Sequence, residues 1–449
     1  MPAAYREEMA GIASVTSAVG LTYDRLVLLN IGYDCIARCT SAVVQPALDD
    51  PAINVLPAPF HARHFDWDSP ELIGMVRELV HSDAVRTDSG SPLLVYVIFI
   101  IAAHSQTIDV SFKRRGVVVY RAITWPGFVG LSTVMKVPVA DDPFGYSVSV
   151  NYRFLNDSLL FNVAQLLRRA WPVSILLRHT IEEVRSFPAA VEYLALQPLI
   201  SPCYFTMCGL RGGEGIILSR NRIGQSDRVD QKRCKSLDED NDSDEGQRAG
   251  FRDSNSVIVQ TNIDHARCFD SEDVIRRWAG EDELLLSAKE RRLLALQRLT
   301  RTVRGVQDWS APAVASRIWS ACAIEPVCNG QTIFVCLMSV GSDPPVFETR
   351  VLTSVPEYCA SVQASAPPVL LSPTAPVGRK SKSMSGKAEL IRNEQLAVRV
   401  AHGHGHGGSF FSHNVSAVQS FWSGQAWVLW TLLSCLCAYL LRVVLDQPL

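Results

Sequence analysis

The most informative segment of the chain is Ile36-Ala37-Arg38-Cys39-Thr40-Ser41-Ala42-Val43-Val44. A cysteine followed by two small hydroxylic residues and an apolar run indicates the first residues of a buried strand with a thiol at its head. If the bond before Cys39 were cut, the thiol would lie beside a free α-amine, which titrates near neutrality. Cys39 would then supply both the nucleophile and the base for attack on a carbonyl. Taken alone, however, a cysteine in this position is more often a small core residue.

The composition is that of a folded protein. The chain has 449 residues, 47% hydrophobic and 20% charged, enough for one large domain or two ordinary ones with a substantial core. A net charge of −2 and the lack of a basic, aromatic-interleaved segment argue against a nucleic-acid partner. The 12 cysteines include no CxxC pair and no Cys/His ladder, so a structural zinc site is not expected. No signal peptide is visible in the first residues, so the chain is either cytosolic or begins downstream of its natural start.

Apolar runs and helical periodicities predict sheets covered by helices. Strands are expected over residues 26–31, 93–103, 109–112, 117–123, 204–207, 215–218, 257–261, 332–338 and 346–352. Helices are expected over 5–20, within 158–196 and over 284–299. Residues 60–68 mix aromatic and ionisable side chains, which makes them too charged for a core strand, so they are expected to line a site. Blocks of strands and blocks of helices favour sheets under helical layers over a repeating βαβ pattern.

Three regions stand apart from the main pattern of strands and helices. Residues 225–252 contain an acidic run and are expected to form a solvated loop insertion. Residues 361–420 form a low-complexity linker, and the alternating histidines 402, 404 and 406 within it are not expected to bind a metal. Residues 421–445 include a charge-free apolar run with flanking tryptophans. They are expected to be either a transmembrane helix or a buried C-terminal helix.

Six short motifs follow one another in a characteristic order. They are Cys39-Thr40-Ser41, His61-Ala62-Arg63 with Asp66, Gly127-Phe128-Val129-Gly130, Gly213-Glu214-Gly215 with Ser219-Arg220-Asn221-Arg222, Gln260-Thr261-Asn262-Ile263-Asp264, and Glu290-Arg291-Arg292. Together they resemble the acid ceramidase and N-acylethanolamine-hydrolysing acid amidase family, from about residue 5 to residue 352. Residues 171–178 and 338–342 look slightly closer to the acylethanolamine amidase branch.

The resemblance implies an α+β protein of the N-terminal-nucleophile hydrolase type, with a four-layer αββα sandwich. Such a protein is made as a proenzyme that cuts itself before the nucleophile, here at Arg38-Cys39. Residues 1–38 would become an α-chain that stays packed on the β-chain, and residues 39–360 would form the amidase domain. No cofactor is expected.

The resemblance also implies roles for individual residues. Cys39 would be the nucleophile and its new α-amine the base, with Asp66 orienting the ammonium. Arg63 would bind near the substrate carbonyl, and Asn262 would donate an N–H to the oxyanion. Arg292 matches the second arginine of the family's Asp-Arg-Arg motif and would support that region, although Arg291 competes for the same role.

The leading hypothesis is therefore a lipid amidase that releases a free fatty acid and an amine from an N-acylethanolamine or a ceramide. By resemblance it would work in the lysosomal or endomembrane lumen, at a membrane surface or held by a C-terminal anchor. Tyr152, however, stands where most of the family has a glutamate. This departure supports the alternative, a catalytically silent, membrane-tethered lipid-binding or scaffold protein on the same fold. A third hypothesis is a cysteine amidase for conjugated bile acids or penicillins.

Overall fold

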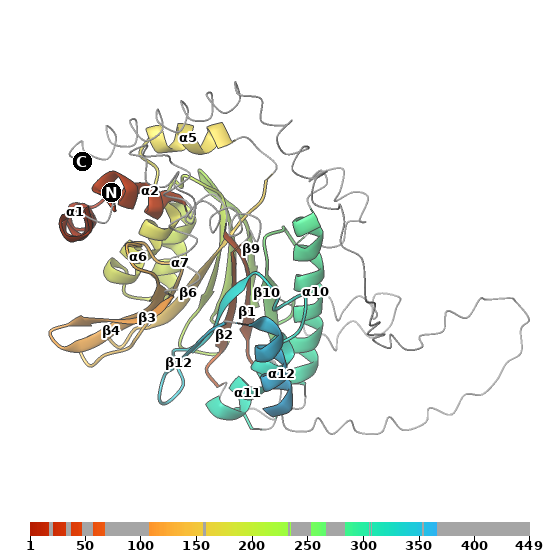
Figure 1. The fold of residues 1–449 in the computed structure, drawn as a ribbon. Coiled ribbons are helices and arrows are strands. Elements are labelled where there is room, and N and C mark those ends of the chain that lie inside the picture. Colours follow the sequence, from red (N-terminus) through yellow and green to blue (C-terminus); the bar gives the residue numbers. More distant parts are fainter. Residues whose placement is uncertain are drawn as a thin grey trace, which may run out of the picture. The chain divides into compact units, whose positions relative to one another are not determined.

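Two antiparallel β-sheets face each other in the computed structural model (Figure 1). The structure describes residues 1–17, 21–32, 37–46, 57–67, 107–155, 159–231, 234, 253–265, 283–304, 306, 308–352 and 354–365. The expected strand over 93–103, the acidic run of the insertion, the linker beyond residue 365 and the candidate membrane helix over 421–445 lie outside these residues. Of the helices that are described, none combines the length and the apolar character needed to cross a membrane.

The first sheet carries the Cys39 segment on an inner strand. Its order is β10-β1-β2-β11-β12. The strands are β1 (Ala37–Val44), β2 (Phe60–Trp67), β10 (Val257–Gln260), β11 (Thr332–Ser339) and β12 (Val346–Val351). Ser41 of β1 pairs with Gln260 on one side and with Arg63 on the other. The sheet therefore brings three stretches that are distant in sequence to one level beside Cys39.

The second sheet is a meander in which each strand pairs with the next one along the chain. Its strands are β3 (Ile108–Arg114), β4 (Val117–Thr124), β5 (Thr133–Lys136), β6 (Tyr146–Tyr152), β7 (Cys203–Cys208), β8 (Gly215–Asn221) and β9 (Gly224–Asp230). The turn between β3 and β4 is made by Arg115 and Gly116, with φ angles of 52° and 83°. Two consecutive positive φ angles give the tight turn that suits the twist of a two-residue hairpin.

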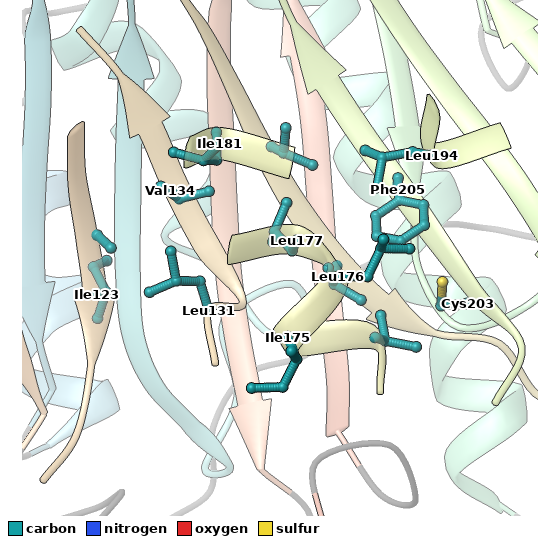
Figure 2. Packing of buried hydrophobic residues seen from close by; sticks show 14 of the residues in the cluster. Ile123, Leu131, Val134, Ile175, Leu176, Leu177, Ile181, Leu194, Cys203 and Phe205 are labelled. Carbon is teal, nitrogen blue, oxygen red and sulfur yellow. The ribbon is translucent and has the colours of Figure 1, made fainter. Parts of the chain in front are cut away.

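Helices cover both outer faces, so the expected four-layer αββα sandwich is confirmed. The helices are α1 (Ala3–Thr16), α2 (Tyr23–Gly32), α5 (Leu159–Leu167), α6 (Val173–Glu183), α7 (Phe187–Leu196), α10 (Glu283–Val303), α11 (Ala311–Cys322) and α12 (Val355–Ser365). Helices α6 and α7 pack on the seven-stranded sheet, whereas α10 packs on β1 and β10. Figure 2 shows the first of these contacts, with Leu176 of α6 and Leu194 of α7 near Phe205 of β7.

Three predictions from the sequence were wrong in local detail. Residues 26–31 belong to helix α2 rather than to a strand, because a short apolar run does not distinguish a buried helix from a buried strand. Residues 60–67 form the inner strand β2, since their ionisable side chains find partners inside the protein. The predicted loop insertion begins with strand β9 over 224–230, and strands β5 and β6 were missed.

Candidate active site

Cys39 and Asn262 meet because β1 and β10 are antiparallel neighbours. Ser41 pairs with Gln260, so moving two residues towards the start of β1 brings Cys39 level with Asn262. The Cys39 backbone N–H donates to Asn262 Oδ1 at 3.0 Å, although the residues are 223 positions apart in sequence. The Asn262 amide Nδ2 donates to the Tyr152 carbonyl at 2.8 Å, which fixes the plane of the amide. The structure therefore brings together the expected nucleophile and the expected oxyanion donor.

Arg63 reaches the sulfur of Cys39 from the neighbouring strand. Its side chain is completely buried and extends diagonally across the strand pair. Nη2 donates to Cys39 Sγ at 2.8 Å and to the Val150 carbonyl at 2.6 Å. Nη1 donates to Asn151 Oδ1 at 3.0 Å. The planar guanidinium is thus held by groups of the second sheet while it touches the thiol of the first.

Asn151 on β6 connects the two sheets at this point. Its Oδ1 accepts from Arg63, and its Nδ2 donates to the carbonyls of Cys39 at 3.2 Å and Gln260 at 3.0 Å. The sequence analysis did not identify Asn151 as a site residue. A signal was present, because Ser147, Ser149 and Asn151 alternate with valines and so share one face of a buried strand.

Asp66 lies at the same level but is bound from the helical layer. Its carboxylate forms a hydrogen-bonded ion pair with Arg291 of α10 and accepts from Thr332 Oγ1 at 2.6 Å. Arg291 Nη2 is also 3.4 Å from Asn262 Oδ1. All of these side chains are buried. One guanidinium therefore links the expected acid residue to the expected oxyanion donor.

Arg292 does not join this group. Its guanidinium pairs with Asp253, and its Nε donates to the Val259 carbonyl at 3.0 Å. Successive residues of an α-helix point about 100° apart, so only one of two adjacent arginines can face Asp66. Of the two arginines that competed for the supporting role, Arg291 contacts Asp66 and Asn262, whereas Arg292 hydrogen-bonds strand β10, which leads to Asn262.

The electrostatics of the site depend on burial and on two arginines. Burial raises the pKa of the Cys39 thiol to about 11, and the charge of Arg63 acts against this rise. Burial also lowers the pKa of His61 and His64 to about 3, so neither carries a charge near neutrality. The two guanidiniums of Arg63 and Arg291 therefore face one carboxylate. Their charges offset part of the effect of burial on the thiol, and they favour negative charge that develops on a nearby oxygen.

The geometry can support acyl transfer. A thiol, a backbone nitrogen that becomes an amine if the preceding bond is cut, and amide and guanidinium donors lie within contact of one another. Within the described ranges, no three His, Cys, Asp or Glu side chains gather where they could hold a metal ion. The histidines at 402, 404 and 406 lie outside those ranges.

The chain is similar in sequence to two groups of known proteins. No protein-family profile matches the chain. It is 26% identical over 351 residues to the N-acylethanolamine-hydrolyzing acid amidase of Cavia porcellus, and the aligned region covers 78% of this chain and 74% of that protein. It is 25% identical over 342 residues to the acid ceramidase of Heterocephalus glaber, with 75% and 67% covered. A solved structure of the Caenorhabditis elegans N-acylethanolamine-hydrolyzing acid amidase ortholog aligns with a TM-score of 0.45 and 21% identity, covering 70% of this chain and 99% of that one.

Proposed function

Since this chain is a homologue of the acid ceramidases and the N-acylethanolamine-hydrolysing acid amidases, we propose that it is a lipid amidase. It hydrolyses the amide bond of an N-acylethanolamine or a ceramide to a free fatty acid and an amine. The observation that carries the proposal is the contact of Cys39 with both Arg63 and Asn262. A sulfur nucleophile, a guanidinium and an amide meet there around the site of a potential N-terminus.

The reaction divides into acylation and deacylation. In the cut protein, the α-amine of Cys39 takes the thiol proton, and Sγ attacks the amide carbon of the substrate. The amine product leaves with that proton, and an acyl-thioester remains on Cys39. Water then attacks the thioester, the α-amine takes a proton from it, and the fatty acid is released. Because burial raises the thiol pKa, a base held beside the sulfur by covalent geometry is an advantage over solvent.

The hydrogen-bond donors around Cys39 stabilise the negative charge of the tetrahedral intermediate. We assign the Nδ2 amide of Asn262 as the oxyanion donor, which requires the substrate oxygen to replace its present acceptor, the Tyr152 carbonyl. Arg63 stays on the sulfur side and stabilises the thiolate. Asp66 and Arg291 form an ion pair on the helical side of the sheet. Arg291 contacts Asn262 Oδ1 and so holds it towards the Cys39 nitrogen.

The same sulfur performs the self-cleavage that exposes this amine. Sγ attacks the carbonyl carbon of Arg38, the C–N bond breaks, and its nitrogen takes the thiol proton and becomes the α-amine. The resulting thioester is hydrolysed to leave the carboxylate of Arg38. Strand β1 runs through this bond, with Arg38 opposite Asp66 and Cys39 opposite Phe65, so the sheet pairing can keep the new terminus in place after the cut.

Contacts between residues 1–38 and the rest of the protein support an α-chain that remains bound after cleavage. Tyr5 donates to Glu182 Oε2 at 2.6 Å, and Glu8 forms an ion pair with Arg178 at 2.8 Å. Asn30 is fully buried and hydrogen-bonds the backbone of residues 127–130. We propose that these contacts hold the two chains together after cleavage.

The lumen of an acidic endomembrane compartment, such as the lysosome, is the location that we propose, with the enzyme at a membrane surface where its substrates reside. Purified full-length protein should contain a fragment that begins at Cys39 and should hydrolyse a fluorogenic N-acyl amide. A panel of N-acylethanolamines and ceramides of different chain lengths identifies the preferred substrate.

Two variants and one control test the mechanism. Cys39→Ala should yield only the uncut, inactive chain, and Asn262→Ala should lower kcat by about 100-fold or more, as expected for loss of an oxyanion donor. Cys322→Ala removes an equally buried thiol from helix α11, away from the site, and should retain cleavage and activity. An uncut wild-type chain with full activity would refute the role of the α-amine.

A catalytically silent scaffold on the same fold remains the second candidate, and Tyr152 is the observation that favours it. The glutamate usual in the family is replaced at the residue whose carbonyl contacts Asn262. Binding of an N-acyl lipid without turnover, in a chain that is cut or uncut at Cys39, would establish this alternative.

A further inference from the structure

A line of buried polar side chains lies between the two sheets behind Cys39. His61 of β2 contacts two serines of β6, with Nδ1 at 2.9 Å from Ser147 Oγ and Nε2 at 2.8 Å from Ser149 Oγ. Ser149 Oγ is 2.9 Å from Ser41 Oγ, which donates to Asn151 Oδ1 at 2.8 Å. All five side chains are completely buried.

Counting the protons that each side chain can donate fixes the direction of every hydrogen bond in this line. The oxygen of Asn151 faces Arg63, whose N–H groups can only donate, so this atom is an acceptor. The single proton of Ser41 is therefore used on Asn151, and Ser149 must donate to Ser41. Ser149 then has no proton left for His61, so His61 must donate to it from Nε2.

The protonation state of the other His61 nitrogen, Nδ1, follows from the charge of the ring. Burial, with the charge of Arg63 as a smaller contribution, lowers the pKa of His61 to about 3, so the imidazole is neutral and has one proton. With that proton on Nε2, Nδ1 accepts from the hydroxyl of Ser147. The bonds therefore all run one way, from Ser147 through His61, Ser149 and Ser41 to the side-chain oxygen of Asn151.

The side-chain oxygen of Asn151 is the acceptor that holds the Arg63 guanidinium. The same guanidinium contacts the Cys39 sulfur, and the other end of Asn151 contacts the Cys39 carbonyl. Rotation of the Asn151 amide would present an NH₂ group to Arg63 and to Ser41. The directed line opposes this rotation because Ser41 donates to the amide oxygen, and it acts together with the carbonyls of Cys39 and Gln260, which accept from Nδ2.

We propose that His61 is a positioning residue, which sets the orientation of Asn151 and Arg63 through Ser149 and Ser41 and thereby aligns the Cys39 sulfur. This role rests on the proposed amidase function. His61 transfers no proton in the reaction and does not touch the substrate. Its task needs one donor and one acceptor in a neutral group, and a charged side chain would break the order of the bonds.

Substitutions that keep or remove these two groups test the proposal. Leucine has a similar size but no polar atom, whereas glutamine offers one acceptor and one donor. We expect His61→Leu to lower kcat at least about tenfold with KM within about twofold, because misplaced catalytic groups slow the chemical step. His61→Gln should stay within about threefold of the wild type in kcat.

A second variant guards against misfolding of the leucine protein. Ser149→Ala removes one hydroxyl of the line and leaves only a small cavity, so it should fold and should again lower kcat rather than raise KM. If His61→Leu or Ser149→Ala, folded as judged by its urea transition, keeps the kcat of the wild type, the positioning role is refuted. The same conclusion follows if glutamine fails as completely as leucine.

A spectroscopic measurement separates this inference from the proposed function. In isotope-labelled histidine NMR, the resonance that disappears in His61→Gln should show a proton on Nε2, none on Nδ1, and no titration between about pH 4.5 and 8. If the wild type has no amidase activity but shows this signature, the proposed function fails and the directed line stands. A proton on Nδ1, or titration within that range, would refute the directed line whatever the activity.

Discussion

Asn30 offers the sharpest test of how residues 1–38 are held. This buried amide of helix α2 uses Oδ1 to accept from the backbone N–H groups of Val129 at 2.6 Å and Gly130 at 2.9 Å. Its Nδ2 donates to the Gly127 carbonyl at 3.0 Å. The motif glycine Gly130 permits the close approach of helix α6 beside this contact, because a Cβ there would lie 2.4 Å from Ser174 Oγ. Replacing Asn30 with leucine keeps the size of the side chain and removes every one of these bonds.

The expected loss of stability follows from the groups left without a partner. Two backbone N–H groups and one carbonyl would remain buried and unpaired, at about 1–3 kcal/mol each. Partial relaxation and the apolar gain of leucine offset some of this, so the free energy of unfolding should fall by about 3–6 kcal/mol. With a slope near 3 kcal/mol per molar urea, the unfolding midpoint should drop by roughly 1–2 M.

The assay is urea unfolding of Asn30→Leu in the Cys39→Ala background, where the chain is expected to stay in one piece. Ser14→Ala is the matched control, because it removes one exposed hydrogen bond of 2.7 Å from the same segment and should change stability by less than about 0.5 kcal/mol. In the cleavable protein, Asn30→Leu should release the fragment 1–38 on gel filtration. An unchanged urea midpoint would refute the assigned contribution of Asn30 to holding the segment.

Three further outcomes are expected. Asp66→Asn should destabilise the Cys39→Ala protein by about 3–5 kcal/mol, because it leaves Arg291 buried without its counter-charge, and adding Arg291→Met should restore part of that loss in urea unfolding. Tyr204→Phe removes a 2.6 Å hydrogen bond to Asp264, two residues from Asn262, and should cost about 1–2 kcal/mol while lowering kcat more than it raises KM. Burial, aided by Arg291, lowers the pKa of His64 to about 3, below its unfolded value of about 6.5. The unfolded chain therefore binds a proton that the folded chain does not, and stability should fall with decreasing pH by up to about 1.4 kcal/mol per unit between these values. His64→Gln should flatten this slope in urea titrations at about pH 4.5 and 6.5, and an equal slope in both proteins would contradict the burial of a neutral His64.

Local sequence patterns identified most of the elements around the site but not their partners. The apolar run after Cys39 indicated strand β1, and the periodicity over 284–299 indicated helix α10. Strand β2 was misread because its ionisable residues suit a core strand only when the opposing sheet and helix supply partners. The run over 26–31 was misread because its apolar spacing fits a helix and a strand equally well.

Within the site, the residue types and their order can be predicted from the sequence. A thiol precedes a small hydroxylic pair, and an amide, a carboxylate and guanidiniums follow in later motifs. The packing of helix α10 on the sheet makes Arg291 rather than Arg292 face Asp66, and the sequence could not show this because the two differ only by the rotation of one helical residue. The contacts of Asn151 and His61 likewise depend on the second sheet lying over the first. Periodicity along a chain reports which side of an element is buried, whereas the register between strands and the facing of layers decide which buried groups meet.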